Sequence, residues 1–311
     1  MQYAEQIVPM ADGRTVEVAT VGDPAGRTVF VHHGTPGSMH VVRFFESIAR
    51  EGALFFVGAS RPGCGHSSRQ IGRTVASVVP DVAQVLDALG RDEYASLGWS
   101  GGGPHALACA ALDRPRCVGA WSLAGVVPLD VDFDWTAGMG PENVEEFALA
   151  REGGARYDEH MAHAGDQFMT ASAANIVELF GDLLSDSDRA ALGDESLRQT
   201  LADVCRQAFA EGWYGFYDDD RAFFTPWGFD PTAIRAPVVV WYGDEDLMVP
   251  PTHGAWLGAH IAGAGVARFG TEGHVSLISN HLDELATSLQ QAFGQNAARP
   301  HERDESRRAP R

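Results

Sequence analysis

The chain has 311 residues, of which 45% are hydrophobic and 21% charged, and its formal net charge is −19 at pH 7. This acidity makes nucleic acid an improbable partner. The sequence contains no lysine, which excludes Schiff-base chemistry and a P-loop. No apolar run of about 18 residues and no N-terminal signal pattern occur, so we expect a cytoplasmic protein that does not enter a membrane. The four cysteines lack CxxC spacing, which favours free thiols.

Extended and helical patterns alternate through the first part of the chain. Two extended stretches around the turn at 11–13 predict an antiparallel hairpin. From residue 28 to residue 123, short apolar runs alternate with helix-like segments, which predicts a parallel sheet with helices on both faces. The extended runs lie at 5–10, 14–21, 28–32, 53–59, 94–99 and 118–123, and the helical ones at 39–50, 75–89 and 104–112.

Strand signals vanish between residues 130 and 230. Acidic helical segments at 141–152, 171–184 and 195–210 predict a separate helical lid there. Strand and helix patterns then resume at 237–242, 252–262, 265–269 and 275–293. We therefore expect a core made of 1–129 and 231–294, a helical cap at 130–230, and a disordered tail at 295–311.

A serine enclosed by glycines follows the strand predicted at 94–99, in the segment Gly98-Trp99-Ser100-Gly101-Gly102. So tight a turn forces the serine into a sparsely allowed backbone conformation, and its flanking positions must lack side chains because strand and helix nearly touch. The hydroxyl then stands at a helix start, where backbone N–H groups face negative charge developing on an attacked carbonyl. The pattern favours Ser100 as a nucleophile, although so short a motif also arises by chance.

The loops that follow predicted strands carry groups capable of chemistry, and they lie at 33–37, 99–102, 243–250 and 270–274. Because the carboxyl ends of parallel strands meet at one edge of a sheet, these loops should converge. A nucleophilic serine needs a base, for which His274 is the candidate, and the base needs an orienting carboxylate, for which Asp246 is favoured. The alternative acids are Asp244, Glu245, Asp130 and Asp132.

These motifs, in this order, resemble the α/β-hydrolase superfamily over residues 3–294. The matching segments are His33-Gly34-Thr35-Pro36-Gly37, Gly98-Trp99-Ser100-Gly101-Gly102, Gly243-Asp244-Glu245-Asp246 with Val249-Pro250, and Gly273-His274. The resemblance implies a mostly parallel eight-stranded sheet with helices on both faces and an α-helical cap inserted after the sixth strand. One departure is Ser60, which stands where the family usually has an aspartate before Arg-Pro-Gly-x-Gly.

The oxyanion hole is expected to use the backbone N–H groups of Thr35 and Gly101, since Pro36 has none. Trp99, beside the nucleophile, is expected to contact substrate. The segment 213–227 holds seven aromatic residues, of which two or three should line the pocket, unless all of them pack inward. No cofactor is implied. No metal is expected either, because Asp158, Glu159, His160 and His163 lack a third His or Cys and fit a solvated helix face.

The sequence therefore predicts a serine hydrolase that cleaves an ester, lactone, thioester or amide of a small organic molecule through an acyl-enzyme. Three alternatives stay open on the same fold. They are an aminopeptidase of the proline-iminopeptidase type, a carbon–carbon hydrolase or cyclase, and a ligand-binding protein with little turnover. The oligomeric state is left open.

Overall fold

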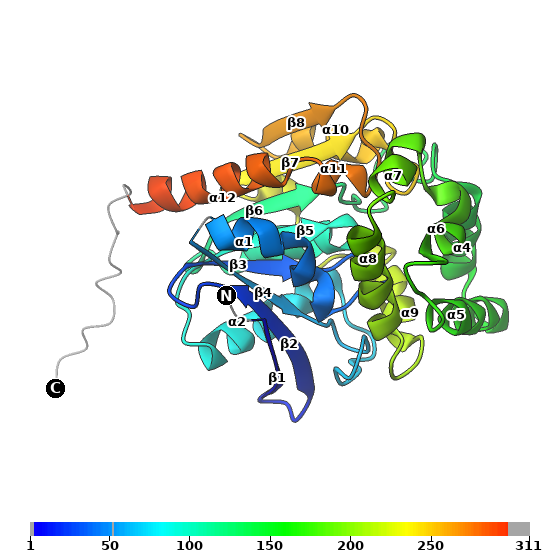
Figure 1. Cartoon of the computed structure of the whole chain (residues 1–311), viewed down its shortest axis with the longest axis horizontal. Helices are drawn as coiled ribbons and strands as arrows, with labels where there is room; N and C mark the ends of the chain where they lie inside the picture. The colour runs from blue at the N-terminus through cyan, green and yellow to red at the C-terminus, as the bar shows by residue number, and fades with distance from the viewer. Residues whose placement is uncertain (1–2, 52, 298–311) are drawn as a thin grey trace.

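The computed structural model of the chain describes residues 3–51 and 53–297. Its centre is an eight-stranded sheet with the strand order β1-β2-β4-β3-β5-β6-β7-β8 (Figure 1). The strands are β1 (Ala4–Pro9), β2 (Thr15–Gly22), β3 (Arg27–His32), β4 (Leu54–Ala59), β5 (Tyr94–Trp99), β6 (Cys117–Leu123), β7 (Val238–Gly243) and β8 (Gly265–Phe269).

Strand pairing is antiparallel only at one side of the sheet. β1 pairs antiparallel with β2, and β2 antiparallel with β4. Every pair from β4 to β8 is parallel. The predicted hairpin and the predicted fold class are thus confirmed, with strand boundaries within about two residues of those expected.

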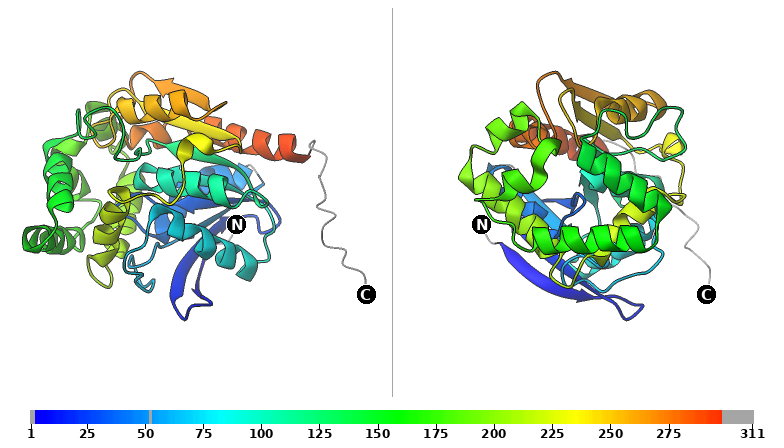
Figure 2. Two further views of the ribbon diagram at one scale, coloured as in Figure 1. Left: turned by 180° about the vertical axis from the view of Figure 1, so that it is seen from behind. Right: turned by 90° about the vertical axis from the view of Figure 1, so that its right-hand side faces the viewer.

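Neighbouring residues of the central strands point to opposite faces of the sheet, as the pleat requires. In β4, Phe55 and Val57 join the core on one face, while Leu54 and Phe56 join the core on the other. Helices α2 and α3 cover one face of the sheet, and α1 and α12 the other (Figures 1 and 2). Residues of α2 and α3 join the first core, and residues of α1 and α12 the second. The helices of this layered part are η1 (Met39–Phe45), α1 (Glu46–Glu51), η2 (Val75–Ser77), α2 (Val78–Ala88), η3 (Ser100–Gly102), α3 (Gly103–Leu112), α10 (Pro251–His260), α11 (Ser276–Ser279) and α12 (Leu282–Ala297).

A helical insertion separates β6 from β7. It gathers at the end of the sheet toward which the arrows of β3 and β6 point (Figure 1). Residues 124–237, all of which the structure describes, contain no strand. The helices are α4 (Pro141–Glu152), α5 (Ala155–Phe168), α6 (Ile176–Phe180), η4 (Gly181–Leu183), α7 (Asp186–Ala191), α8 (Glu195–Ala208), α9 (Tyr214–Phe223) and η5 (Pro231–Ala233).

The insertion makes direct contact with the layered part of the protein. Ser38, just before η1, donates a hydrogen bond of 2.9 Å to the carbonyl oxygen of Val204 in α8. The division of the chain into a core and a cap therefore stays a prediction.

Several sequence-based expectations differ from the structure. The helix expected at 39–50 starts as 3₁₀ turns over Met39–Phe45, packed so tightly that a Cβ on Gly58 would lie 2.7 Å from Val42 Cγ1. The helix expected at 171–184 begins only at Ile176. The helix expected at 275–293 is two helices, and the side chains of Asn280 and His281 between them both contact Glu272.

The tail expected to be disordered starts at 295, whereas α12 continues to Ala297. Residues 298–311 lie outside the described residues. Within the described part of the chain, no helix has both the length and the apolar character to cross a membrane. Nor do three or more His, Cys, Asp or Glu side chains gather there in an arrangement that could hold a metal ion.

Candidate active site

Ser100 occupies a strained turn between β5 and α3. Its φ is +56°, a left-handed conformation that side chains other than glycine rarely adopt. The flanking glycines are needed for space, because a Cβ on Gly98 would lie 2.2 Å from the Gly102 oxygen, and one on Gly102 would lie 2.1 Å from the His32 oxygen. The turn thus has the geometry that the sequence pattern predicts.

His274 and Asp246 approach from the loops after β8 and β7. His274 Nδ1–H donates a hydrogen bond of 2.7 Å to Asp246 Oδ2, and both side chains are almost fully buried. The other carboxylate oxygen, Oδ1, accepts from the backbone N–H groups of Met248 at 2.9 Å and Val249 at 2.8 Å. These bonds fix Asp246 and leave His274 Nε2 free to accept a proton.

None of the four alternative acids contacts His274 in the described structure. Asp244 pairs instead with Arg268 at 2.7 Å, and Glu245, Asp130 and Asp132 are exposed to solvent. The carboxylate partner of His274 is therefore Asp246.

Burial alone would lower the pKa of His274, since it disfavours the charged imidazole. The negative charge of Asp246 and its hydrogen bond outweigh burial, and Asp188 adds to them, so that the pKa is raised from its ordinary value of 6.5. The ring of Trp99 stacks on the imidazole ring of His274, with the two centroids 5.5 Å apart. The Nε1–H of Trp99 donates a hydrogen bond of 3.2 Å to the carbonyl oxygen of His274. Trp99 thus contacts the histidine directly.

Ser100 and His274 both line a small cavity of about 40 Å³, together with Trp99. No hydrogen bond joins Ser100 Oγ to His274 in the described structure. Such contacts are often long without substrate and tighten when it binds.

A larger cavity of about 180 Å³ opens on the insertion side of Ser100. By volume it holds about six water molecules, which suits a small substrate group. Of the seven aromatic residues at 213–227, Phe216 and Phe223 line it. Its other linings include Thr35, Gly101, Glu142, Glu146, Phe147, His160, His163, Asp220 and Met248.

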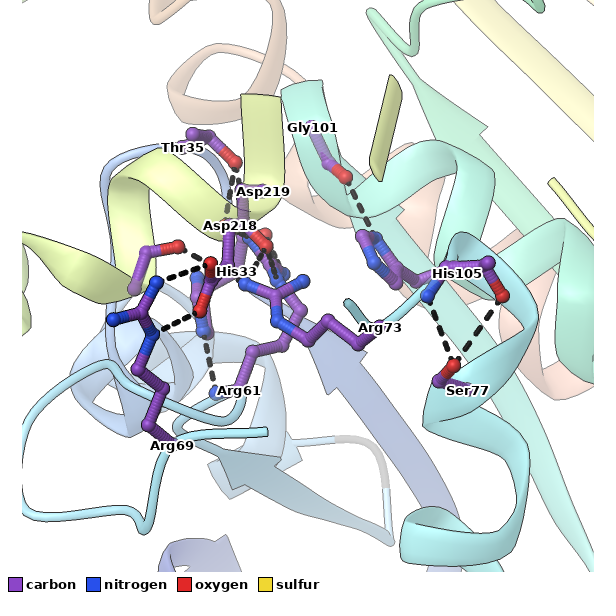
Figure 3. A network of polar contacts seen from close by, with 12 residues as sticks. His33, Thr35, Arg61, Arg69, Arg73, Ser77, Gly101, His105, Asp218 and Asp219 are labelled. Carbon is purple, nitrogen blue, oxygen red and sulfur yellow. Dashed lines mark hydrogen bonds and ion pairs between the residues drawn. The ribbon is translucent and has the colours of Figure 1, made fainter. Parts of the chain in front are cut away.

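Thr35 and Gly101, the expected oxyanion-hole residues, lie side by side at this cavity. A Cβ on Gly101 would lie 2.4 Å from Thr35 Oγ1, so only glycine fits beside that threonine. The hydroxyl of Thr35 donates to Asp219 Oδ2 at 2.9 Å and accepts from Arg61 at 3.0 Å. Figure 3 shows this contact, in which the side chain anchors the loop that carries the Thr35 N–H group.

Behind Thr35 lies a buried ion-pair cluster that the sequence did not indicate. Asp219 of α9 accepts hydrogen bonds from Arg61 and forms an ion pair of 2.6 Å with Arg73 (Figure 3). Arg61 also donates to the carbonyl oxygens of His33 and Gly34 at 2.6 and 2.9 Å. Although burial disfavours its charge, the two arginines hold the pKa of Asp219 well below the ordinary range.

A second unforeseen carboxylate, Asp188 of α7, binds the loop that carries His274. It accepts from the backbone N–H groups of His274 at 3.1 Å, Val275 at 2.7 Å and Ser276 at 2.9 Å. Ser185 and Asp188 also form a capping box at the start of α7. That spacing is a sequence signal for a helix start, but it gives no sign of the contact with His274.

Known proteins resemble the chain over nearly its whole length. A hydrolase of uncharacterised function from Bacillus subtilis strain 168, YcgS, is 23% identical over 89% of this chain and 94% of its own. Among solved structures, an α/β-hydrolase fold protein from Nakamurella multipartita superposes with a TM-score of 0.63 at 24% identity, covering 94% of this chain and all of that one. An esterase from Exiguobacterium antarcticum gives a TM-score of 0.66 at 17% identity, covering 95% and 100%.

The family model described as the alpha/beta hydrolase fold matches residues 27–281, which is most of the chain. The matched range begins at β3 and ends between α11 and α12. It therefore contains the strained turn, the buried Asp246–His274 pair and the insertion. The chain belongs to the α/β-hydrolase fold family and is a hydrolase of that fold.

Proposed function

We propose that the chain is a serine hydrolase that cleaves a carboxylic acyl bond, as in an ester, lactone, thioester or amide, of a small organic molecule. The observation that carries this proposal is the strained Ser100 at a cavity shared with a buried histidine, whose other ring nitrogen is held by Asp246. That is the arrangement which activates a serine hydroxyl.

In this mechanism Ser100 Oγ attacks the carbonyl carbon while His274 Nε2 takes the hydroxyl proton. Asp246 keeps the proton of the neutral imidazole on Nδ1 and stabilises the imidazolium that forms. The backbone N–H groups of Thr35 and Gly101 receive the developing oxyanion. His274 then returns its proton to the leaving group, and it later activates the water that releases the acid.

The surroundings support an acyl substrate of limited size. The two cavities meet at Ser100, which provides separate room for the two sides of a scissile bond. Phe216 and Phe223 supply apolar walls to the larger one. Such walls exclude water and orient the substrate at the reacting carbon.

Labelling with a fluorophosphonate probe tests the proposal. The probe should modify Ser100, and the protein should hydrolyse p-nitrophenyl acetate. Ser100→Ala should lose labelling and lower kcat on the order of a million-fold, with the melting temperature nearly unchanged. Ordinary turnover by the alanine variant, or a folded protein that the probe does not label, would contradict the mechanism.

A further inference from the structure

Three carboxyl groups of the insertion, outside the proposed catalytic machinery, line the larger cavity beside Ser100. Glu142 is exposed to solvent, whereas the other two are buried or partly buried. Asp220 lies on α9 and is fully buried, and Glu146 lies on α4 with its side chain 15% exposed. Both line the cavity that Ser100 lines. A substrate bound at Ser100 would therefore meet them.

Only one of the two carboxyl oxygens of Asp220 has a hydrogen-bond partner in the described structure. The hydroxyl of Tyr157 donates to Oδ2 at 2.8 Å, while Oδ1 is buried without any hydrogen-bond partner in the described structure. A buried carboxyl oxygen left unpaired costs free energy, which a donor on a ligand would recover. The unpaired atom therefore points to a ligand that donates.

The two carboxyls also lack a cationic partner. The nearest basic group to Glu146 is His160, whose Nε2 lies 3.9 Å from Oε2. Burial lowers the pKa of His160, which favours the uncharged ring. Arg73, the arginine that acts on Asp220, is already paired with Asp219. The site holds two acids and no free positive charge among the described residues.

We propose that Asp220 and Glu146 form a subsite for a positively charged ammonium group on the substrate of Ser100. An ammonium group has three N–H donors and no acceptor, which matches the ionised forms of the two carboxyl groups, since these only accept. This inference rests on the proposed function, because it names the substrate class of the same cavity: a small acyl compound that carries an amine.

The protonation of Asp220 and Glu146 should depend on whether a cation is bound between them and the substrate site. Burial raises the pKa of Glu146 to about 8, and burial followed by the charge of Glu146 raises that of Asp220 well above its ordinary value. Without ligand, the raised pKa values favour the protonated form of each group. A bound cation favours their ionised forms, so its binding should release protons. The other titratable or charged groups that face the pair are Glu142, Tyr157, His160, His163, Tyr217, Asp219 and Arg73.

Binding to Ser100→Ala tests the subsite without any need for turnover. Alaninamide and isobutyramide differ by NH₃⁺ in place of CH₃, and at pH 6.5 the amine is protonated. The variant should bind alaninamide at least tenfold more tightly than isobutyramide in calorimetry. The apparent enthalpy for alaninamide alone should change with the ionisation enthalpy of the buffer, because protons are released.

Adding Glu146→Gln to Ser100→Ala should reduce that preference at least tenfold. Adding Glu145→Gln should leave it unchanged, because Glu145 is the neighbouring, exposed glutamate of α4 and does not line the cavity. Asp220→Asn should act like Glu146→Gln. If Asp220→Asn fails to fold, the partly exposed Glu146 still provides the test.

Equal affinity for the two amides would overturn the subsite, as would a preference that survives Glu146→Gln. Fluorophosphonate labelling of the parent protein reports separately on the proposed function. Selective alaninamide binding without labelling would retain the subsite and reject the serine mechanism. Fluorophosphonate labelling together with equal affinity for the two amides would retain the serine mechanism and reject the subsite.

Discussion

The two sides of helix α9 place neighbouring carboxyl groups in opposite environments. Asp219 faces the loops of the sheet, where Arg61 and Arg73 surround it. Asp220 faces the insertion, where it meets Tyr157 and the carboxyl of Glu146. Both are fully buried, yet the pKa of Asp219 is lowered and that of Asp220 is raised.

The contrast between Asp219 and Asp220 gives a criterion that distinguishes buried acids with a structural role from buried acids that bind a ligand. A buried acid that is paired and hydrogen-bonded within the chain stays charged and holds elements together, whereas one without a counter-charge is held toward its neutral form until a cation binds. Asp246, Asp219 and Asp188 belong to the first kind, since their donors are histidine, arginine and backbone N–H groups. Asp220 belongs to the second. Substitution of a paired acid should therefore lower either the catalytic rate or the free energy of unfolding.

Among the buried acids, the largest loss of rate is expected at Asp246. Asp246→Asn should lower kcat by about ten-thousand-fold, because the amide favours the wrong tautomer of His274. Asp244→Asn, two residues away, removes the same charge from an exposed pair with Arg268 and should cost far less. Steady-state kinetics on p-nitrophenyl acetate measure both. The opposite ranking would make Asp244 the orienting acid.

The next effect is on the free energy of unfolding, and it should differ in size between Asp219 and Asp220 and, at high pH, in sign. Asp219→Asn leaves Arg61 and Arg73 buried without a counter-charge, and it should lower the free energy of unfolding by about 3 to 5 kcal/mol. Asp220→Asn should cost much less, and at high pH it should stabilise the protein. Denaturant unfolding at several pH values measures both.

The pH dependence of these two variants follows from linkage. Asp219 has a lowered pKa, so its contribution to stability is present above the ordinary carboxyl pKa and is lost in acid. Asp220 and Glu146 have raised pKa values, so their contribution is present in acid and is lost as the pH rises, through about 8 for Glu146. Equal destabilisation by both aspartate variants at every pH would remove the distinction between the two sides of α9.

Much of the fold and of the candidate site follows from local sequence. Ser100 could be predicted because a strand, glycines without side chains and a helix constrain the turn. Asp246 and His274 followed because the carboxyl ends of parallel strands converge. The aromatic segment at 213–227 behaves as expected in part, since two of its seven rings line the cavity.

The buried acids could not be found in this way. The run Asp218-Asp219-Asp220 has the composition of a solvated helix face, in a chain with 42 acidic residues. Successive helical residues differ by about 100° in direction, so Asp218 meets Arg69, while its neighbours meet the arginine cluster and the insertion. Only the packing of distant elements decides which aspartate is paired. The same holds for Asp188, whose donors lie 86 to 88 residues away.

The smallest effect is expected at Asp188, and it tests whether the insertion tunes the proposed base. The negative charge of Asp188 contributes to the raised pKa of His274. In the proposed mechanism kcat/KM rises with pH as His274 loses its proton, so the rise in the parent protein should lie above 6.5. Asp188→Asn removes the charge and should move this limb to lower pH. Asp186→Asn, an exposed charge in the first turn of the same helix, is the matched control and should leave the limb in place. A merely structural role for Asp188 would lower activity at all pH values without moving the limb, and in that case the insertion would hold the loop of His274 without setting its proton affinity.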